Sequence, residues 1–319
     1  MQRHEPIYIA GHNGLVGSAL LRNLRAAGYS NLVTADHRDL DLTAGDAVRS
    51  FFQASRPAYV FLAAARVGGI LANSTRPAEF IVQNLGIELN VIREAYAAGV
   101  KRLLFLGSSC VYPKDCPQPI QEEYLLTGRL ETTNQAFAMA KITGIEMCRA
   151  LNFQYATKYI AAMATNLYGP DDNYDLQDSH VIPALVRKMH EAKTAKQDSV
   201  VVWGTGSPRR EFLHVDDLAN ACVFLMQLPP ELYDAIARMS PPIVNVGSGE
   251  DITIAELATL VQEIVGSTAT IRWDHEKPDG TPRKLLATHR MRALGWAPLI
   301  SLREGIAATY REYIRRIPS

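Results

Sequence analysis

The sequence predicts an α/β protein that consists of a doubly wound parallel sheet and a smaller α/β C-terminal domain. Apolar, β-rich runs alternate with amphipathic stretches, the first run leads into a glycine-bearing turn, and the pattern changes after about Asn166. Strands that alternate with helices at this spacing are typical of a parallel sheet with helices on both faces. With 319 residues, the chain is also long enough for two packed lobes.

The elements of the first half follow one another in a regular order. Residues 6–10 are predicted to be the first strand because apolar, β-branched and aromatic side chains are contiguous there, and residues 18–27 follow as an amphipathic helix. The same alternation predicts strands at 31–35, 58–62 and 102–106, and helices at 45–55, 77–98 and 136–152.

The second half is less regular. A loop is predicted at residues 169–173, a helix at 180–192 and a strand at 199–203. Residues 243–246 again have the composition of a core strand, so the two lobes are expected to interleave in the sequence. The predicted boundaries are 1–167 plus about 212–247 for the first lobe, and about 168–211 plus 248–319 for the second.

Composition and charge indicate an ordinary globular protein. There are 33 basic and 33 acidic residues, so no charge imbalance points to nucleic acid or a membrane surface as a partner. The four cysteines lie too far apart for a zinc-ribbon pattern, and we expect reduced thiols and no metal site. The N-terminus lacks a signal-peptide pattern and no apolar run approaches ~18 residues. These features lead us to expect a cytoplasmic protein without membrane partners.

The segment GHNGLVG at residues 11–17 follows the first predicted strand and opens the first predicted helix. In this context glycines permit a tight turn and a close approach of backbone to a pyrophosphate, which meets the helix N-terminus. The sequence therefore predicts a Rossmann-type dinucleotide site. Its expected contacts are Gly11, Asn13, Gly14, Leu15, Val16 and Gly17.

The residues that follow the second predicted strand bear on the choice of dinucleotide. Asp36 would favour the free ribose hydroxyls of NAD, whereas His37 and Arg38 suit the additional phosphate of NADP. These residues alone leave both cofactors open.

Several longer segments carry a family resemblance that runs nearly from end to end. The chain resembles the extended short-chain dehydrogenase/reductases, and within them the GDP-L-fucose synthases, which are GDP-4-keto-6-deoxy-mannose 3,5-epimerase/4-reductases. The segments that carry the resemblance are LAAARVGG (62–69), GSSCVYP (107–113), TNLYGP (165–170), SHVIP (179–183), VWG (202–204), REFLHVDD (210–217) and KPDGTPRK (277–284).

The resemblance implies a reductase site with one replacement. Reduction of a ketone by hydride transfer needs an acid beside the carbonyl oxygen, which this family supplies with a tyrosine, a lysine one helical turn further on and a serine. Ser108 and Lys141 match the serine and lysine, but Phe137 stands at the tyrosine position. We interpret Phe137 as an introduced change that slows reduction while leaving binding intact, although natural loss remains an alternative.

The resemblance also implies an epimerase site. Inversion at the carbons beside the 4-keto group needs a base that removes a proton and an acid that returns one to the opposite face. By resemblance the base is Cys110 and the acid is His180. From the residues alone, Cys110 can equally be a buried structural thiol and His180 a helix cap. His12 and His214 are interpreted as structural.

Ligand contacts are carried over from the family in the same way. NADP(H) is favoured, NAD(H) stays possible because of Asp36, and Asn13 departs from the arginine that family members often carry there. A GDP-sugar substrate and a homodimer are implied. The implied cofactor contacts are Ala63, Ala64, Leu106, Lys141, Ala164 and Leu167, and the implied substrate contacts are Asn166, Lys188, Trp203, Arg210 and Asp279.

Two other functions are compatible with these motifs. One is the same chemistry on a GDP-4-keto-6-deoxy-heptose, which residues around 174–178 would decide. The other is a non-catalytic sugar-nucleotide sensor. The joint presence of Ser108, Cys110, Lys141 and His180 argues against the sensor, because a binding module needs neither a base nor an acid.

Overall fold

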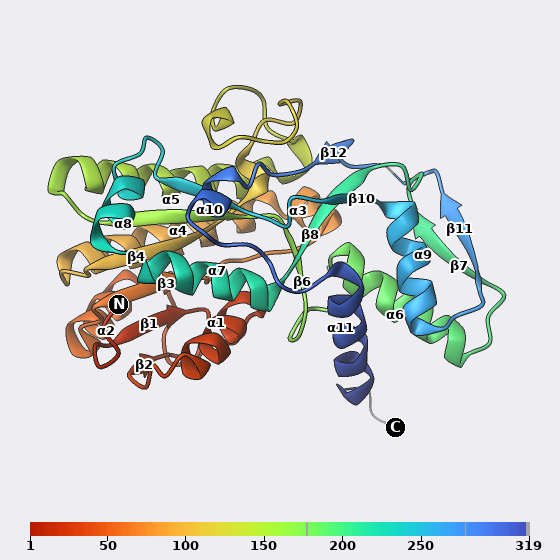
Figure 1. The fold of residues 1–319 in the computed structure, drawn as a ribbon, viewed down its shortest axis with the longest axis horizontal. Coiled ribbons are helices and arrows are strands. Elements are labelled where there is room, and N and C mark those ends of the chain that lie inside the picture. Colours follow the sequence, from red (N-terminus) through yellow and green to blue (C-terminus); the bar gives the residue numbers. More distant parts are fainter. Residues whose placement is uncertain (177, 278, 317–319) are drawn as a thin grey trace.

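The computed structural model describes residues 1–176, 178–277 and 279–316 and confirms the predicted doubly wound sheet. Six parallel strands are arranged in the order β2-β1-β3-β4-β5-β9 (Figure 1). β2 lies on one side of β1, and β3 and the later strands lie on the other side. The carboxyl ends of β1 and β3 therefore lie at the crevice where such folds bind ligands. The strands are β1 Ile7–Ala10, β2 Leu32–Val33, β3 Tyr59–Leu62, β4 Arg102–Ser108, β5 Tyr159–Ala164 and β9 Ile243–Val246.

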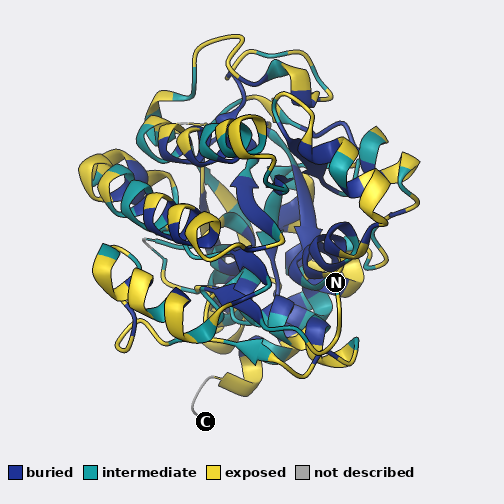
Figure 2. Cartoon of the chain, turned by 90° about the vertical axis from the view of Figure 1, so that its left-hand side faces the viewer, coloured by how far each residue is buried: buried dark blue, intermediate teal, exposed yellow. Residues whose placement is uncertain are grey.

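Helices cover both faces of this sheet because its strand residues point alternately to either side. Ile7 and Ile9 pack with Leu20 and Leu218 on one face, whereas Tyr8 packs in a separate cluster on the other face. Figure 2 shows the buried strands between more exposed helices. The first face carries α1 Leu15–Ala26, α7 Val215–Gln227 and α8 Pro230–Ala237; the second carries α2 Gly45–Ser55, α4 Pro77–Ala97 and α5 Gln135–Tyr155.

The second lobe has its own apolar cluster beside this sheet (Figure 1). Its two-stranded parallel sheet packs with three helices, and a four-stranded sheet links it to the first lobe. The elements are β7 Ser199–Trp203 and β11 Thr270–Asp274; α6 Val181–Thr194, α9 Ile254–Val265 and α11 Leu302–Arg316; and β6 Asn166–Tyr168, β8 Arg209–His214, β10 Asp251–Thr253 and β12 Arg283–Lys284.

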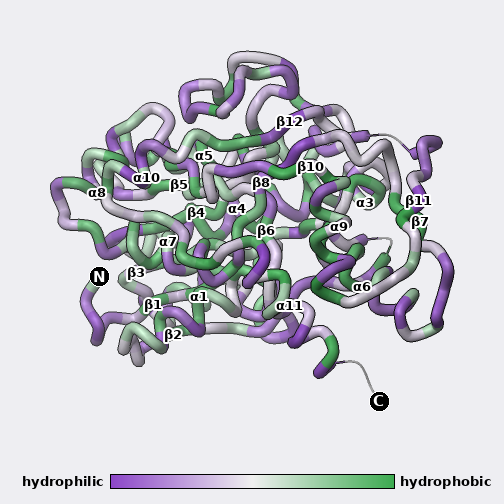
Figure 3. Tube along the Cα trace, turned by 45° about the vertical axis from the view of Figure 1, so that its right-hand side comes forward, coloured by the Kyte–Doolittle hydropathy of each residue, from purple (hydrophilic) through white to green (hydrophobic). Residues whose placement is uncertain are grey.

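Short elements complete the chain and connect the lobes. Met291 and Trp296 pack into the first lobe's cluster although they precede α11 of the second lobe in sequence, and the predicted domain boundaries stay a prediction. Figure 3 shows hydrophobic stretches concentrated in the strands and inner helices. These elements are α3 Ile70–Thr75, α10 His289–Ala293, and the 3₁₀ turns η1 Ser109–Val111, η2 Glu122–Tyr124 and η3 Thr132–Asn134.

Several element boundaries differ from the sequence-based expectation, and those of α1 and β2 show why. The first helix begins at Leu15 rather than at residue 18, because the glycine turn leads directly into it through Gly14 at the N-cap. The second strand is only Leu32–Val33 and pairs with β1 over these two residues. Both residues are half-buried, because the strand lies at the edge of the sheet. Within the described residues, no helix is long and apolar enough to span a bilayer.

Candidate active site

The glycine turn has the close backbone packing that its sequence predicts. Gly11 has a φ of +86°, and a Cβ atom there would lie 2.7 Å from the Cα of Ala64. A Cβ on Gly17 would lie 2.0 Å from the carbonyl oxygen of Gly11, whereas Gly14 has space for one. Gly11 and Gly17 are therefore required for the turn to close against the residues after β3.

The N-terminus of α1 is open to an anion. Gly14 occupies its N-cap position without a side-chain cap, and the first turn of the helix contains no acidic residue. Unpaired backbone N–H groups and the positive end of the helix dipole favour a phosphate at such a position. Together with the close-packed turn, this geometry fits the diphosphate of a dinucleotide.

Asp36 lies beside this turn and already has partners. Asn13 donates a hydrogen bond of 2.5 Å from Nδ2 to Oδ1 of Asp36, and Nε2 of His12 lies 3.5 Å from the same oxygen. Asn13 thus holds the carboxylate at the edge where an adenosine ribose would bind. His12 contacts a candidate cofactor residue, so its structural interpretation stays a prediction.

Ser108 lies at the end of β4, and Phe137 lies near the start of α5. Ser108 is the last residue of β4, and its hydroxyl accepts a 3.4 Å hydrogen bond from the backbone N–H of Cys110. The ring of Phe137 packs edge-on against Phe80, with a centroid separation of 6.4 Å. Nζ of Lys141 lies 5.8 Å from the centroid of the Phe137 ring, as expected for residues one helical turn apart.

Lys141 has a buried acidic partner that sequence reasoning missed. Its Nζ lies 3.3 Å from Oε1 of Glu88 on α4, and the two side chains are 4% and 1% exposed. Burial raises the pKa of Glu88 from 4.5 to about 7, and the nearby Lys141 opposes this rise. Gly144 provides the necessary space, because a Cβ there would lie 2.9 Å from Oε2 of Glu88.

The substitution Glu88→Gln is expected to remove a pH-dependent component of stability. The folded chain retains a proton on Glu88 up to about pH 7, whereas the unfolded chain releases it near pH 4.5, so folding becomes less favourable as pH rises between these values. At ~1.4 kcal/mol per pKa unit, the wild type should lose on the order of 3 kcal/mol relative to the variant across this window. Urea unfolding at several pH values measures this difference, and a constant difference would contradict the raised pKa.

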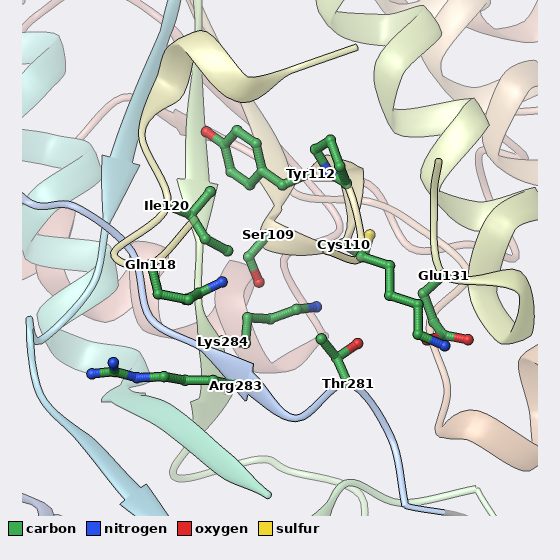
Figure 4. A pocket seen from close by; sticks show the side chains of 11 residues that line it. Ser109, Cys110, Tyr112, Gln118, Ile120, Glu131, Thr281, Arg283 and Lys284 are labelled. Atoms are coloured by element: carbon green, nitrogen blue, oxygen red, sulfur yellow. The ribbon is translucent and has the colours of Figure 1, made fainter. Parts of the chain in front are cut away.

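Cys110 is buried and lies in the turn η1 directly after β4. Burial raises the pKa of its thiol, and this rise is opposed by Lys284, by the hydroxyl of Ser108 and by Lys141, in that order. Figure 4 shows that Cys110 and Lys284 line the same small pocket. The sequence motif contains Lys284, but sequence reasoning gave it no role.

His180 occupies the N-cap position of α6, but its side chain makes no capping hydrogen bond. The structure therefore does not support the capping interpretation. His180 is exposed, yet surrounding protein desolvates its imidazole and lowers its pKa. The preceding segment is held against the loop after β3, because the N–H of Gly69 donates a 3.1 Å hydrogen bond to the carbonyl oxygen of Asp178.

Trp203 and its neighbours form a cationic aromatic surface on the second lobe. Trp203 is 48% exposed, and Nζ of Lys188 lies 5.6 Å from the centroid of its ring. Nζ of Lys277 lies 5.4 Å from the centroid of the same ring, and the sequence analysis did not assign Lys277 to this site. Burial lowers the pKa of Lys188, which also donates a 2.9 Å hydrogen bond to the carbonyl oxygen of Val201. The surface fits an aromatic base with an adjacent anion.

The other predicted substrate residues differ in the hydrogen bonds that their side chains already make. Arg210 makes a hydrogen bond to its neighbour's carbonyl oxygen, and burial lowers the pKa of its guanidinium. The carboxylate of Asp279 accepts hydrogen bonds from the backbone and hydroxyl of Thr205 at 2.9 and 2.7 Å. Asn166 donates to the carbonyl oxygen of Glu211 at 2.8 Å, so its amide fastens β6 to β8. Asp279 and Asn166 thus already hold the backbone in place.

The remaining predicted contacts lie where the sheet topology places them. His214 is buried and caps α7 by accepting a 3.2 Å hydrogen bond from the N–H of Asp216, which confirms its structural role. Leu106 and Ala164 lie near the ends of adjacent strands, and Leu167 lies in β6. Within the described ranges, no group of three or more His, Cys, Asp or Glu residues has the geometry to hold a metal ion.

These features define a dinucleotide-binding α/β protein of the short-chain dehydrogenase type, with a serine, a lysine and a thiol near the carboxyl end of β4. The model of the NAD dependent epimerase/dehydratase family matches residues 7–247. The chain belongs to this family.

Individual relatives and solved structures match almost the whole chain. A protein named putative GDP-L-fucose synthase 2 from Arabidopsis thaliana is 54% identical over 317 residues, which cover 99% of this chain and 94% of the relative. A GDP-6-OMe-4-keto-L-xylo-heptose reductase from C. jejuni has a TM-score of 0.91 at 37% identity and 99% coverage of both chains. MlghC, a GDP-mannoheptose C4 reductase from Campylobacter jejuni with NADP bound, has a TM-score of 0.89 at 38% identity, with 98% and 99% coverage.

Proposed function

We propose that this protein is an NADPH-dependent 3,5-epimerase/4-reductase that converts GDP-4-keto-6-deoxy-mannose to GDP-L-fucose, with a slow reduction step. The 54% identity to a protein named putative GDP-L-fucose synthase 2 supports the substrate. The single observation that carries the chemistry is the gathering of Ser108, Cys110 and Lys141 at one end of β4, because a sensor needs no such set.

In the proposed reduction, the glycine turn and the N-terminus of α1 would hold NADPH, which would supply the hydride for the keto carbon. The hydroxyl of Ser108 donates a hydrogen bond to the keto oxygen and stabilises the negative charge that develops there. The ammonium of Lys141 adds positive charge near the end of β4. Phe137 has no proton to give, so the oxygen must obtain its proton from a less well-placed donor, and this slows the step.

In the proposed epimerisation, the thiolate of Cys110 removes a proton from the carbon beside the keto group. The C–H bond breaks, an S–H bond forms, and the electron pair moves to the keto oxygen, where Ser108 stabilises the enolate. His180 then gives a proton to the opposite face. The absence of a capping hydrogen bond from its side chain supports this role.

The proposal is tested by incubating the substrate with the protein and NADPH in deuterium oxide and recording mass spectra. Deuterium gain with slow reduction is the expected result. Absence of both exchange and reduction, with substrate binding confirmed, would overturn the assignment.

A GDP-4-keto-6-deoxy-heptose is the second candidate substrate. Two heptose reductases from the same organism match the fold with TM-scores of 0.91 and 0.89, which favours this alternative over the sensor. Competition between the hexose and heptose substrates in the deuterium experiment separates the two, since the better substrate gains deuterium first.

NADP(H) is the proposed cofactor. The NADP-bound reductase with a TM-score of 0.89 supports it, and the open N-terminus of α1 fits the diphosphate that both dinucleotides share. Asp36 is the residue that still favours NAD(H), because its carboxylate would repel a phosphate on the ribose.

The substitution Asp36→Ala is expected to shift preference towards NADPH by about tenfold, which is equivalent to ~1.4 kcal/mol. Removal of the carboxylate relieves repulsion of the additional phosphate and removes an acceptor for the ribose hydroxyls of NADH. Titration of cofactor fluorescence measures both affinities. Asp39→Ala, a change of an exposed carboxylate in the same turn, is the matched control. Equal shifts in the two variants would contradict the assignment of Asp36.

A cytoplasmic homodimer is the proposed form of the protein. The four cysteines are all free thiols, which suits a reducing compartment. Exposed apolar side chains recur at seven-residue intervals on α4, at Val82, Leu89 and Tyr96, and Met139 and Phe153 continue the surface on α5. Two copies related by a two-fold axis would bury this surface.

The substitution Leu89→Arg is expected to dissociate the proposed dimer, because it places an unpaired charge in the middle of the buried surface. Light scattering coupled to size-exclusion chromatography measures the mass. Leu299→Arg is the matched control, because Leu299 is 83% exposed and lies outside α4 and α5. A monomeric wild type, or dissociation by Leu299→Arg as well, would argue against this interface.

A further inference from the structure

Lys284 has an unusual position for a lysine. It lies at the end of β12 and lines the same pocket as Cys110, and its ammonium has no hydrogen bond or ion pair to any other residue that the structure describes. Figure 4 shows its side chain extending from the strand into the pocket, alongside Ser109 and towards the turn that carries Cys110. The position of an unpaired ammonium group away from the open surface therefore needs an explanation.

The backbone around Lys284 is fixed from two sides. β12 pairs in parallel with β8, which aligns Lys284 with Arg210. The N–H of the next residue, Leu285, donates a 2.9 Å hydrogen bond to Oε1 of Gln118, and its carbonyl oxygen accepts one of 2.7 Å from the N–H of Ile120. Gln118 and Ile120 line the same pocket. Lys284 is therefore held at the pocket wall by its strand and not by its side chain.

The neighbouring cation of the same strand points elsewhere. Nε of Arg283 lies 2.5 Å from Oδ2 of Asp251, and Figure 4 shows its side chain directed away from Cys110. Successive residues of a strand face opposite sides, which explains the difference. Only Lys284 of this pair presents its charge to the turn η1.

The charges around Cys110 favour Lys284 as the group that acts on the thiol. Burial raises the pKa of Cys110, and Lys284 is the strongest of the groups that lower it. Reciprocally, burial lowers the pKa of Lys284, and Cys110 is the strongest of the groups that raise it. The other ionisable groups that act on this pair are Lys141, Arg210, Cys116 and Glu131, the last of which already pairs with Lys114 at 2.9 Å.

We propose that Lys284 is a positioning residue that stabilises the thiolate form of Cys110, which is the form that takes a proton from the sugar carbon. The inference rests on the proposed function of Cys110 as the base. The ammonium of Lys284 keeps its own protons throughout: the C–H bond breaks, the S–H bond forms on Cys110, and the electron pair moves to the keto oxygen as an enolate. A nearby fixed cation stabilises the thiolate relative to the neutral thiol.

The test measures the ionisation of Cys110 in the absence of substrate. The ultraviolet absorbance of thiolate is titrated against pH in the full chain and in Cys110→Ala, and the difference isolates Cys110. The same pair of titrations is repeated with Lys284→Met, Lys284→Arg and Arg283→Met. Binding of NADPH by each variant confirms that it is folded.

The Lys284→Met variant is expected to move the ionisation of Cys110 to higher pH by one unit or more, whereas Lys284→Arg and Arg283→Met leave it close to that of the wild type. Deuterium exchange at neutral pH should fall at least about tenfold in Lys284→Met and be rescued by Lys284→Arg. An unchanged titration in Lys284→Met, or an equal shift in Arg283→Met, would overturn the inference.

This design separates the inference from the function on which it rests. A shifted thiolate titration without any deuterium exchange in the wild type would leave the link between Lys284 and Cys110 intact and refute the proposed reaction. Exchange in the wild type with no effect of Lys284→Met on the titration would refute only the role of Lys284.

Discussion

The substitution Phe137→Tyr is expected to increase the rate of reduction of the 4-keto sugar by ~10²–10⁴, the range that a positioned general acid typically supplies. The ring at this position is held by packing, because it lies edge-on against Phe80 at 6.4 Å between centroids. A tyrosine at this position differs by a single oxygen atom, so the core should accept it. Lys141 would lie one helical turn away with its ammonium near the same ring.

The increase should depend on Lys141. Its ammonium lies 5.8 Å from the ring centroid and would stabilise the phenolate that forms when a tyrosine gives up its proton. In the background Lys141→Met, Phe137→Tyr should therefore recover much less activity. Consumption of NADPH at saturating substrate measures reduction, and deuterium incorporation measures epimerisation, which Phe137→Tyr should leave within a few-fold of its original rate. No gain in reduction would refute the interpretation of position 137.

Local features of the fold could be predicted because they are recorded in short-range patterns. The helix Gly45–Ser55 and the strands Ser199–Trp203 and Ile243–Val246 have the predicted bounds. Their periodicity and their flanking turns lie within the same ten or fifteen residues. The start of α1 was misplaced because a glycine turn carries no apolar periodicity, although it continues directly into the helix.

Pairings between distant segments could not be predicted in the same way. Glu88 lies on α4 between apolar neighbours, and its charge alone hinted that a buried partner exists, but only packing of α4 on α5 identifies Lys141. Lys284 meets Cys110 because β12 joins β8 at the edge of the pocket. Such contacts depend on how strands pair across the lobes, and short-range sequence patterns do not determine the strand order.

Removal of Cys110 has the other large expected effect. The substitution Cys110→Ala should lower deuterium incorporation by ~10²–10⁴, because it removes the side chain assigned as the base that takes the carbon-bound proton. Ser108 and Lys141 remain, so slow reduction should continue and yield the sugar nucleotide without inversion. Mass spectra of the product, together with its stereochemistry by proton magnetic resonance, distinguish this result from a general loss of activity. Exchange at the wild-type rate would exclude Cys110 as the base.

The pH dependence of exchange tests the pairing of Cys110 with His180. The reaction needs a thiolate and a protonated imidazole, yet burial raises the pKa of Cys110 and desolvation lowers that of His180. The required combination is therefore a minority form at every pH, and its population rises up to the lowered pKa of His180 and falls above the raised pKa of Cys110. In His180→Gln the need for a protonated imidazole disappears, so the remaining exchange should keep rising with pH until Cys110 is ionised. A decline at alkaline pH that persists in His180→Gln would mean that another group supplies the acid.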